Sequence, residues 1–113
     1  MNYNIILDAP FRKEVKRLAK KYPSLKKDLV ALQNELLSNP NTGVNLGGGI
    51  RKVRMAIGSK GRGKSHGARV ITVNVVVSVE ETEINLLFIY DKAERDNITS
   101  AEIEALMEEV GLK

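Results

Sequence analysis

The chain has 113 residues, of which 42% are hydrophobic and 28% charged. This size and composition predict a single folded domain, residues 1–113, and exclude a disordered tail. The sequence has no cysteine and one histidine, His66, which excludes disulfides, a thiol nucleophile and metal sites built from cysteines or clustered histidines. No apolar run approaches the roughly 20 residues of a membrane span, and the first run stops at Asp8, too early for a signal peptide. We therefore expect a cytoplasmic protein with no membrane partner.

The net charge of +4 conceals an uneven distribution along the chain. Fifteen lysines and arginines against four acids give residues 1–75 a net charge of +11. Three basic and ten acidic residues give residues 76–113 a net charge of −7. A basic body with an acidic C-terminal segment favours a polyanion as partner, met by one face of the protein. The alternative interpretation is an ordinary solvated surface.

The first 40 residues predict a short strand followed by a helical hairpin. Residues 3–7 have the pattern of an edge strand, and Asp8 before Pro10 marks a helix start. Apolar residues recur at helical spacing up to Tyr22, where Pro23 ends this helix. The opposite side of the same helix is cationic: Arg12, Lys13, Lys16, Arg17 and Lys20. A second helix carries leucines at positions 25, 29, 32 and 36.

The remainder predicts three strands and a last helix. Residues 41–49 are rich in turn formers, and residues 50–57, 69–79 and 84–90 have strand patterns. The sequence from Thr99 to Glu102 fits a capping box, which predicts a short C-terminal helix. The order β-α-α-β-β-β-α predicts an α+β fold with a small antiparallel twisted sheet and helices on one face.

A glycine-rich loop over residues 58–67 contains a nucleotide-binding pattern. Gly58 to Ser65 fits G-x-x-x-x-G-K-[ST] at every position. A phosphate-binding loop of that kind needs a helix directly after it, because the helix amides hold the phosphates. Here the β-branched run of residues 70–73 follows instead. We therefore favour a flexible cationic hairpin loop, whose Lys60, Arg62 and Lys64 suit a phosphate backbone.

Alternation along the strand at residues 50–57 places two cations together. Lys52 and Arg54 share one face, roughly 7 Å apart given the rise of a strand, while the apolar residues between them face the core. Arg69 opens the next strand, and Tyr90 ends the last one, with Lys92 just after it. These side chains either form a cation-lined floor for phosphates or merely solvate an open sheet face.

The chain resembles toxins of the RelE/HigB type, within the RelE/ParE superfamily of type II toxin–antitoxin systems. The stretches that carry the resemblance are residues 49–56, the loop after them, residues 67–71 and residues 86–92. The resemblance implies a cytoplasmic, ribosome-dependent endoribonuclease that cuts mRNA in the A site of the 70S ribosome. It also implies a protein antitoxin as partner, with operator DNA bound only through the antitoxin complex.

The resemblance further implies the residues of the site. The two strand cations of the family map onto Lys52 and Arg54, and the arginine of the following strand onto Arg69. In RelE-type members a further arginine and a tyrosine occupy places that fall near Ala93 and Thr99 here, so Tyr90, Asp91 and Lys92 are the nearby substitutes. The expected catalytic residues are Lys52, Arg54, Arg69, Tyr90 and Lys92. The expected RNA and ribosome contacts are Arg12, Lys13, Lys16, Arg17, Lys20, Lys60, Arg62, Lys64 and His66, with a catalytic base as the alternative role of His66.

The chemistry that this set fits is metal-independent cleavage by the RNA itself. The 2′-hydroxyl attacks the adjacent phosphorus, which yields a 2′,3′-cyclic phosphate and a 5′-hydroxyl. Arginines can stabilise the extra negative charge of the transition state, Lys52 can move a proton, and Tyr90 can stack on a base. We expect neither a cofactor nor a metal. Two alternatives stay open: an inhibitor of DNA gyrase of the ParE kind, without nuclease activity, and a non-catalytic RNA-binding module.

Overall fold

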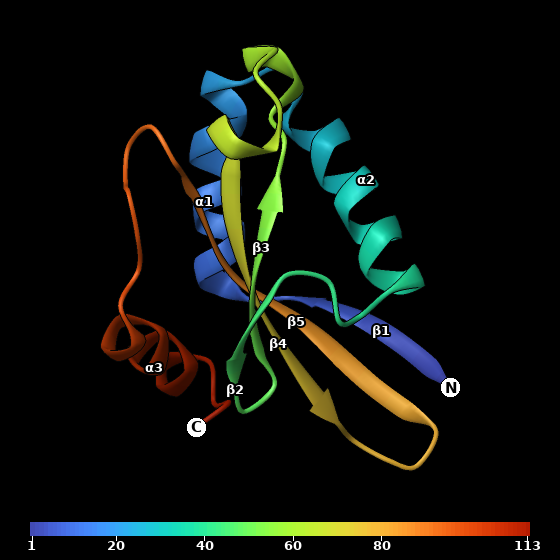
Figure 1. Cartoon of the computed structure of the whole chain (residues 1–113). Coiled ribbons are helices and arrows are strands. Elements are labelled where there is room, and N and C mark those ends of the chain that lie inside the picture. The colour runs from blue at the N-terminus through green and yellow to red at the C-terminus, as the bar shows by residue number, and fades with distance from the viewer.

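The computed structural model describes residues 1–113, which form a five-stranded sheet with three α-helices (Figure 1). The strands are β1 (Asn2–Leu7), β2 (Val44–Gly47), β3 (Ile50–Met55), β4 (Ala68–Val76) and β5 (Glu81–Asp91). The α-helices are α1 (Ala9–Lys21), α2 (Leu25–Ser38) and α3 (Ser100–Glu109). Two short 3-10 turns, η1 (Gly58–Lys60) and η2 (Lys64–His66), lie between β3 and β4. The predicted α+β fold is confirmed.

The sheet is mixed, which corrects the expectation of a purely antiparallel sheet. Its strand order is β1-β5-β4-β3-β2. The strands from β2 to β5 pair antiparallel with their neighbours, but β1 pairs parallel with β5. The helical hairpin carries the chain from β1 to the far side of the sheet, so β1 is left at the edge where the last strand returns beside it. Strand β2 lies inside the expected loop, and its four exposed residues carry no alternating pattern that reveals it.

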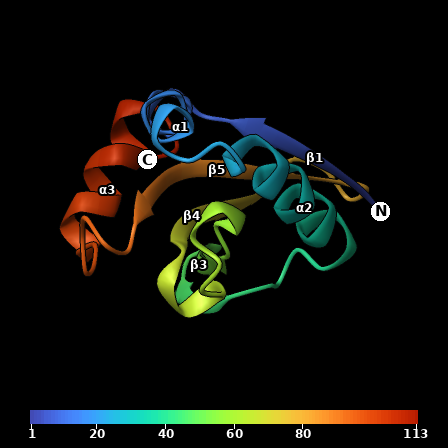
Figure 2. The same cartoon turned by 90° about the horizontal axis from the view of Figure 1, so that it is seen from above.

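The helices cover both faces of the sheet, so the expectation that all of them share one face is wrong. The hairpin packs Phe11, Leu18 and the leucines of α2 against one face. On the other face, Ile103 and Met107 of α3 pack against apolar side chains of β4 and β5. Figures 1 and 2 show the strands β4 and β5 between α2 and α3. The near-continuous apolar sequence of β4 and β5 explains this arrangement, because a strand with one solvated face would alternate.

Local signals in the sequence position the ends of several elements. The capping box that opens α3 is present, with the Thr99 hydroxyl accepting from the Glu102 amide and the Glu102 carboxylate accepting from the Thr99 amide. Strand β4 ends at Val76, earlier than expected, so Val77 and Val79 lie in the turn that follows and are exposed. Val53 and Met55 of β3 face the hairpin, as predicted, which turns Lys52 and Arg54 toward the opposite face.

Substitution of leucines on α2 tests how much the packing of the hairpin contributes to the free energy of unfolding. We expect Leu36→Ala to lower the free energy of unfolding by about 2–5 kcal/mol, because Leu36 is fully buried and its loss leaves a cavity. Leu37→Ala is the matched control, since Leu37 is 43% exposed and its removal should cost under about 1 kcal/mol. Urea unfolding followed by circular dichroism measures both. Equal losses would mean that the hairpin does not pack on the sheet as described.

Candidate functional site

Three of the predicted catalytic residues lie side by side across the sheet. Arg54 on β3 pairs in register with Arg69 on β4, and Arg69 pairs with Tyr90 on β5. Residues paired in this way point to the same face, with their Cα atoms about 5 Å apart. That face is the one opposite the helical hairpin, and Lys52 lies two residues before Arg54 on it. We call Lys52, Arg54 and Arg69 the cation row.

Arg69 is buried, which differs from the expected position on an open sheet surface. Its side chain is 7% exposed. The guanidinium donates hydrogen bonds to the carbonyls of Lys64 (3.0 Å), Ala68 (3.2 Å) and Ser65 (3.4 Å). The loop that follows β3 therefore folds back over the Arg69 side chain and holds it in one orientation.

The cation row forms no ion pair with a carboxylate. None of the ion pairs in the structure involves Lys52, Arg54 or Arg69. Arg54 is exposed, and the Lys52 ammonium donates a 3.0 Å hydrogen bond to the side-chain oxygen of Asn97. Three positive charges at neighbouring positions on one face form a place where a phosphate can be bound through charge-assisted hydrogen bonds.

Tyr90 and Lys92 occupy positions that do not match the roles expected of them. The Tyr90 ring is 3% exposed and packs in the apolar cluster beneath α3, so it offers little surface for a base to stack on. Burial raises the pKa of the Tyr90 phenol, and the charges of Arg69 and Arg95 only partly offset this. Lys92 lies beyond the end of β5, and its ammonium contacts Asp96, so its charge is already paired.

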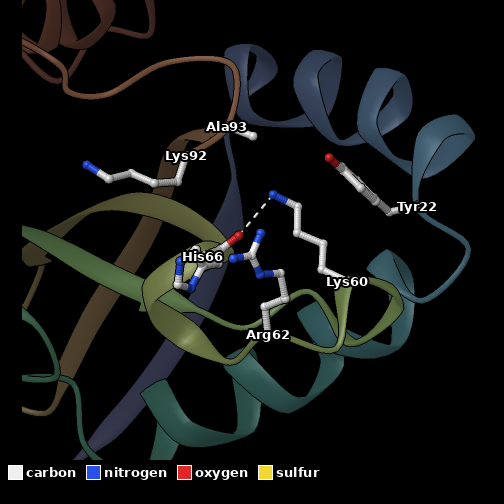
Figure 3. Close-up of a pocket in the computed structure, with 6 residues that line it drawn as sticks. All are labelled: Tyr22, Lys60, Arg62, His66, Lys92 and Ala93. Carbon is white, nitrogen blue, oxygen red and sulfur yellow. Dashed lines mark hydrogen bonds between the residues drawn. The ribbon is translucent and has the colours of Figure 1, made fainter.

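A second concentration of basic groups forms a pocket of about 360 Å³ at the other side of the loop (Figure 3). We call it the basic pocket; its lining residues are Tyr22, Lys60, Arg62, His66, Lys92 and Ala93. Figure 3 shows the Tyr22 ring on one side, Arg62 and His66 on the other, and Lys60 between them. The Lys92 side chain points away from this group. The pocket thus combines predicted RNA contacts of the loop with the end of α1.

A buried carboxylate lies under the basic pocket. Asp91 is fully buried and accepts hydrogen bonds from the Tyr22 hydroxyl (2.5 Å), the Lys60 ammonium (2.6 Å) and the Ala93 amide (2.9 Å). Burial alone would raise the pKa of Asp91, but the hydrogen bonds from Lys60, Tyr22 and Ala93 outweigh it and hold the pKa below its usual range. Lys60 also donates to the His66 carbonyl at 2.9 Å. Lys60 is therefore engaged inside the protein, which leaves Arg62 and His66 to face a ligand.

The glycine-rich loop is a structured connection between two strands, and no α-helix follows it. The two turns η1 and η2 lead directly into β4, which confirms the interpretation against a nucleotide-binding loop. The loop is not free, however, although we expected a flexible one. The Ser59 amide donates to the Ser24 hydroxyl at 2.7 Å, and the Gly58 amide donates to Asp28 at 3.0 Å. These bonds tie the start of the loop to the start of α2.

The cations of α1 are exposed, but they lie on the other side of the molecule from the cation row. The apolar side of α1 packs on the sheet, so its basic side faces away from it. Arg17 forms ion pairs with Glu14 at 3.0 Å and Glu94 at 2.8 Å, and the hydrogen bonds to Glu94 and Glu14 raise its pKa. The four other predicted contacts on this helix have no carboxylate partner: Arg12, Lys13, Lys16 and Lys20.

A comparison with models of protein families places the chain. Residues 11–111 match the family described as the RelE toxin of the RelE / RelB toxin-antitoxin system. The chain belongs to this family. A search of curated proteins finds no match. The resemblance to RelE-type toxins is thereby confirmed, and membership of this family implies a cognate antitoxin as partner.

Two kinds of feature are absent from the structure. No helix of the structure has the length and apolar character needed to cross a membrane. No group of three histidine, aspartate or glutamate side chains gathers closely enough to hold a metal ion. Asn97, which contacts Lys52, was not among the residues expected from the sequence, whereas Asp91 was expected beside Tyr90 and Lys92 as a substitute and is fully buried in the structure. An acid directly after a nearly apolar strand must either reach water or find partners, and Asp91 finds partners.

The pairing of Asp91 predicts how stability depends on pH. Since folding lowers the pKa of Asp91, its contribution is present at neutral pH, and it is lost as the pH falls below the ordinary aspartate pKa of about 3.9 and through the native pKa. We expect Asp91→Asn to lower the free energy of unfolding at pH 7 by roughly 3 kcal/mol, because Lys60 keeps its charge without a partner. The difference in free energy of unfolding between variant and wild type should narrow as the pH falls below the ordinary aspartate pKa of about 3.9.

Asp96→Asn is the matched control for this experiment. The Asp96 side chain is 97% exposed, so its loss should change the free energy of unfolding by under about 1 kcal/mol. Urea unfolding of the three proteins between about pH 3 and pH 7 makes the comparison. A difference in free energy of unfolding between Asp91→Asn and wild type that stays constant across this range would contradict the pairing of Asp91 with Lys60.

Proposed function

We propose that this toxin is a ribosome-dependent endoribonuclease that cleaves mRNA in the A site of the cytoplasmic 70S ribosome and so stops translation. The observation that carries the proposal is the cation row, in which Lys52, Arg54 and Arg69 share one sheet face without a carboxylate partner. A protein surface of ordinary solubility intersperses both signs of charge, whereas a site for a phosphodiester needs positive charge that is not neutralised.

The reaction we propose uses the nucleophile that RNA carries. The 2′-hydroxyl oxygen forms a bond to the adjacent phosphorus while the bond to the 5′-oxygen breaks, which leaves a 2′,3′-cyclic phosphate and a 5′-hydroxyl. One proton leaves the 2′-hydroxyl and one joins the 5′-oxygen. Lys52, beside Arg54 on the same strand face, is the group we assign to proton transfer.

Arg69 and Arg54 would stabilise the negative charge that builds up on the phosphate oxygens. Three carbonyls take three of the five guanidinium N–H donors of Arg69, so two remain for a phosphate. Because the carbonyls already fix the guanidinium, little reorganisation is needed when the charge develops, and such preorganised donors give the largest electrostatic benefit. Tyr90, buried beside Arg69, acts as a positioning residue in this scheme.

The loop and α1 supply the remaining contacts with RNA and ribosome. Arg62, Lys64 and His66 lie on the loop next to the carbonyls that hold Arg69. The exposed cations of α1 extend the positive surface over the opposite side of the molecule. Attraction spread over many such charges is long-ranged and independent of sequence, which suits docking onto ribosomal RNA.

The antitoxin, in this proposal, binds the hairpin side and connects the toxin to operator DNA. A groove of about 300 Å³ runs between α1 and α2, with apolar side chains that include Phe11 and Val15 at its floor. Arg12, Lys16 and Lys26 stand at its rim. An amphipathic helix with acidic residues beside its apolar stripe is complementary to this groove in both shape and charge.

The first test removes charge from the cation row. We expect Arg54→Ala combined with Arg69→Ala to slow single-turnover mRNA cleavage on a programmed 70S complex by at least about 10²-fold, because each transition-state donor contributes on this order. Ribosome pelleting should fall only modestly, since most cations remain. Excess chelator should leave wild-type cleavage unchanged, as the proposed step uses no metal.

Two controls accompany this test. Lys26→Ala with Lys27→Ala removes the same charge from exposed positions on α2 and should leave cleavage close to wild type. Arg54→Ala alone covers the case in which burial of Arg69 makes the double variant unstable, because Arg54 is exposed. Equal loss of cleavage and pelleting would make the arginines docking residues. Intact mRNA together with inhibited DNA supercoiling would favour a gyrase inhibitor. RNA binding without mRNA cleavage and without inhibited supercoiling would favour a non-catalytic RNA-binding module.

The second test concerns the antitoxin. We expect the rate of association with the product of the neighbouring antitoxin gene to fall as salt rises, because opposite charges accelerate encounter. Arg12→Glu with Lys16→Glu should slow association by tenfold or more at low salt, while Lys13→Glu with Lys20→Glu serves as the matched control on the same helix outside the groove. Stopped-flow mixing measures these rates. An association rate that does not respond to salt would overturn the electrostatic part of the proposal.

A further inference from the structure

A hollow of about 380 Å³ lies on the same face as the cation row, between α3 and the strands β2 and β3. Its apolar walls come from Leu46 on β2, Ile50 on β3, and Ile98 and Ile103 at α3. Its polar side comes from Lys52, Asn97, Ser100 and Glu104. The hollow therefore directly adjoins Lys52, a member of the cation row. Its surface is partly apolar and partly polar, and the proposed reaction does not use it.

We propose that this hollow binds one unpaired nucleobase of the RNA substrate and that Asn97 reads its edge. This inference rests on the proposed function and deepens it, since it names a determinant of sequence preference. The nucleobase belongs to the nucleotide whose phosphate lies on the cation row.

The spacing along β3 places base and phosphate within one nucleotide of each other. Ile50, Lys52 and Arg54 alternate onto the same face, so successive side chains are about 7 Å apart. A phosphate held at Lys52 thus lies one such step from Ile50, at the edge of the hollow. That step matches the reach from a phosphate to its own base in an unstacked strand, which is the state in which proteins read RNA bases.

The Asn97 side chain has an orientation suited to reading a base. Its oxygen accepts the hydrogen bond from the Lys52 ammonium at 3.0 Å, and this contact directs the amide NH₂ group away from Lys52. The NH₂ group has no hydrogen-bond partner within the protein, so both of its donors are free to meet a ligand. Ring nitrogens and carbonyl oxygens of bases are acceptors, and the apolar walls suit the flat faces of a base.

A base fits this hollow better than a segment of protein does. Its apolar lining is limited to two strand residues and two residues at the start of α3, whereas a helix presents anchors over two or more turns. The acid at its rim, Glu104, is already paired with Lys113 at 2.6 Å, so it does not repel a nucleotide. The unneutralised charge of Lys52 beside the hollow favours an occupant that carries a phosphate.

The test exchanges the donors of Asn97 for acceptors. Asn97→Asp keeps the size of the side chain and an oxygen for Lys52, but it removes the NH₂ group. We expect this variant to change the base preference at one position of the cleavage site by about tenfold, because a hydrogen-bonded base contact gives discrimination of this order. Asn34→Asp, at an exposed position on α2, introduces the same charge and should leave the preference unchanged. Sequencing of mRNA 5′ ends in a reconstituted translation system measures the preference.

A binding experiment separates failure of this inference from failure of the proposed function. The full chain, labelled with ¹⁵N and ¹³C at methyl groups, is titrated with each of the four nucleoside 5′-monophosphates. Shifts at the Asn97 amide and at the methyls of Ile50 and Ile103 that weaken in Asn97→Asp support the pocket, even if mRNA is not cut. No shift there, together with an unchanged preference in Asn97→Asp, overturns the pocket while leaving the nuclease proposal intact. If Asn97→Asp loses antitoxin binding but keeps the base preference, the nucleobase pocket is also overturned and the hollow is assigned to the antitoxin.

Discussion

The pairing of the Asp91 carboxylate is the interaction on which the arrangement of the loop and of Arg69 depends. A buried ionised carboxylate lowers the free energy of unfolding unless it is paired and hydrogen-bonded. Removing one partner destabilises the protein more than replacing both partners by apolar groups, because it leaves a buried charge unpaired. Lys60 arrives from the loop, Tyr22 from the end of α1 and the Ala93 amide from the turn after β5. Three segments that are distant in sequence are thereby held at one point.

The pairing of Asp91 also positions Arg69 of the cation row, through the backbone of the loop. Lys60 binds Asp91 and the His66 carbonyl together, which fixes both ends of the segment from η1 to η2. The carbonyls of Lys64 and Ser65, within that segment, hold the guanidinium of Arg69. A buried carboxylate at the end of β5 therefore determines where a guanidinium on β4 points, although the two side chains face opposite sides of the sheet.

Regular local patterns in the sequence predicted the fold, and partners distant in sequence account for what it did not predict. The leucine spacing of α2 and the alternation of β3 follow from geometry within a few residues, so both helices of the hairpin and the direction of Lys52 and Arg54 were predictable. The parallel pairing of β1 with β5 and the burial of Arg69 depend on contacts across most of the chain. For the same reason the sequence suggested Lys60 as a free cation, because its partner Asp91 lies 31 residues further on. Asn97 had no signal of its own, since an exposed asparagine in a loop is ordinary.

The placement of charge separates two tasks on the two sides of the sheet. The cations of α1 and the rim of the hairpin groove lie on the side that carries the larger apolar core, while the cation row lies on the side of α3. An antitoxin helix seated in the groove would cover Arg12 and Lys16, two of the charges that we propose for docking on ribosomal RNA, without touching Arg54 or Arg69. Inhibition in that arrangement would act on docking, and the arginines would not need to change when the antitoxin binds or leaves. A toxin built in this way can be held inactive in a folded, fully assembled state and released by loss of the antitoxin alone.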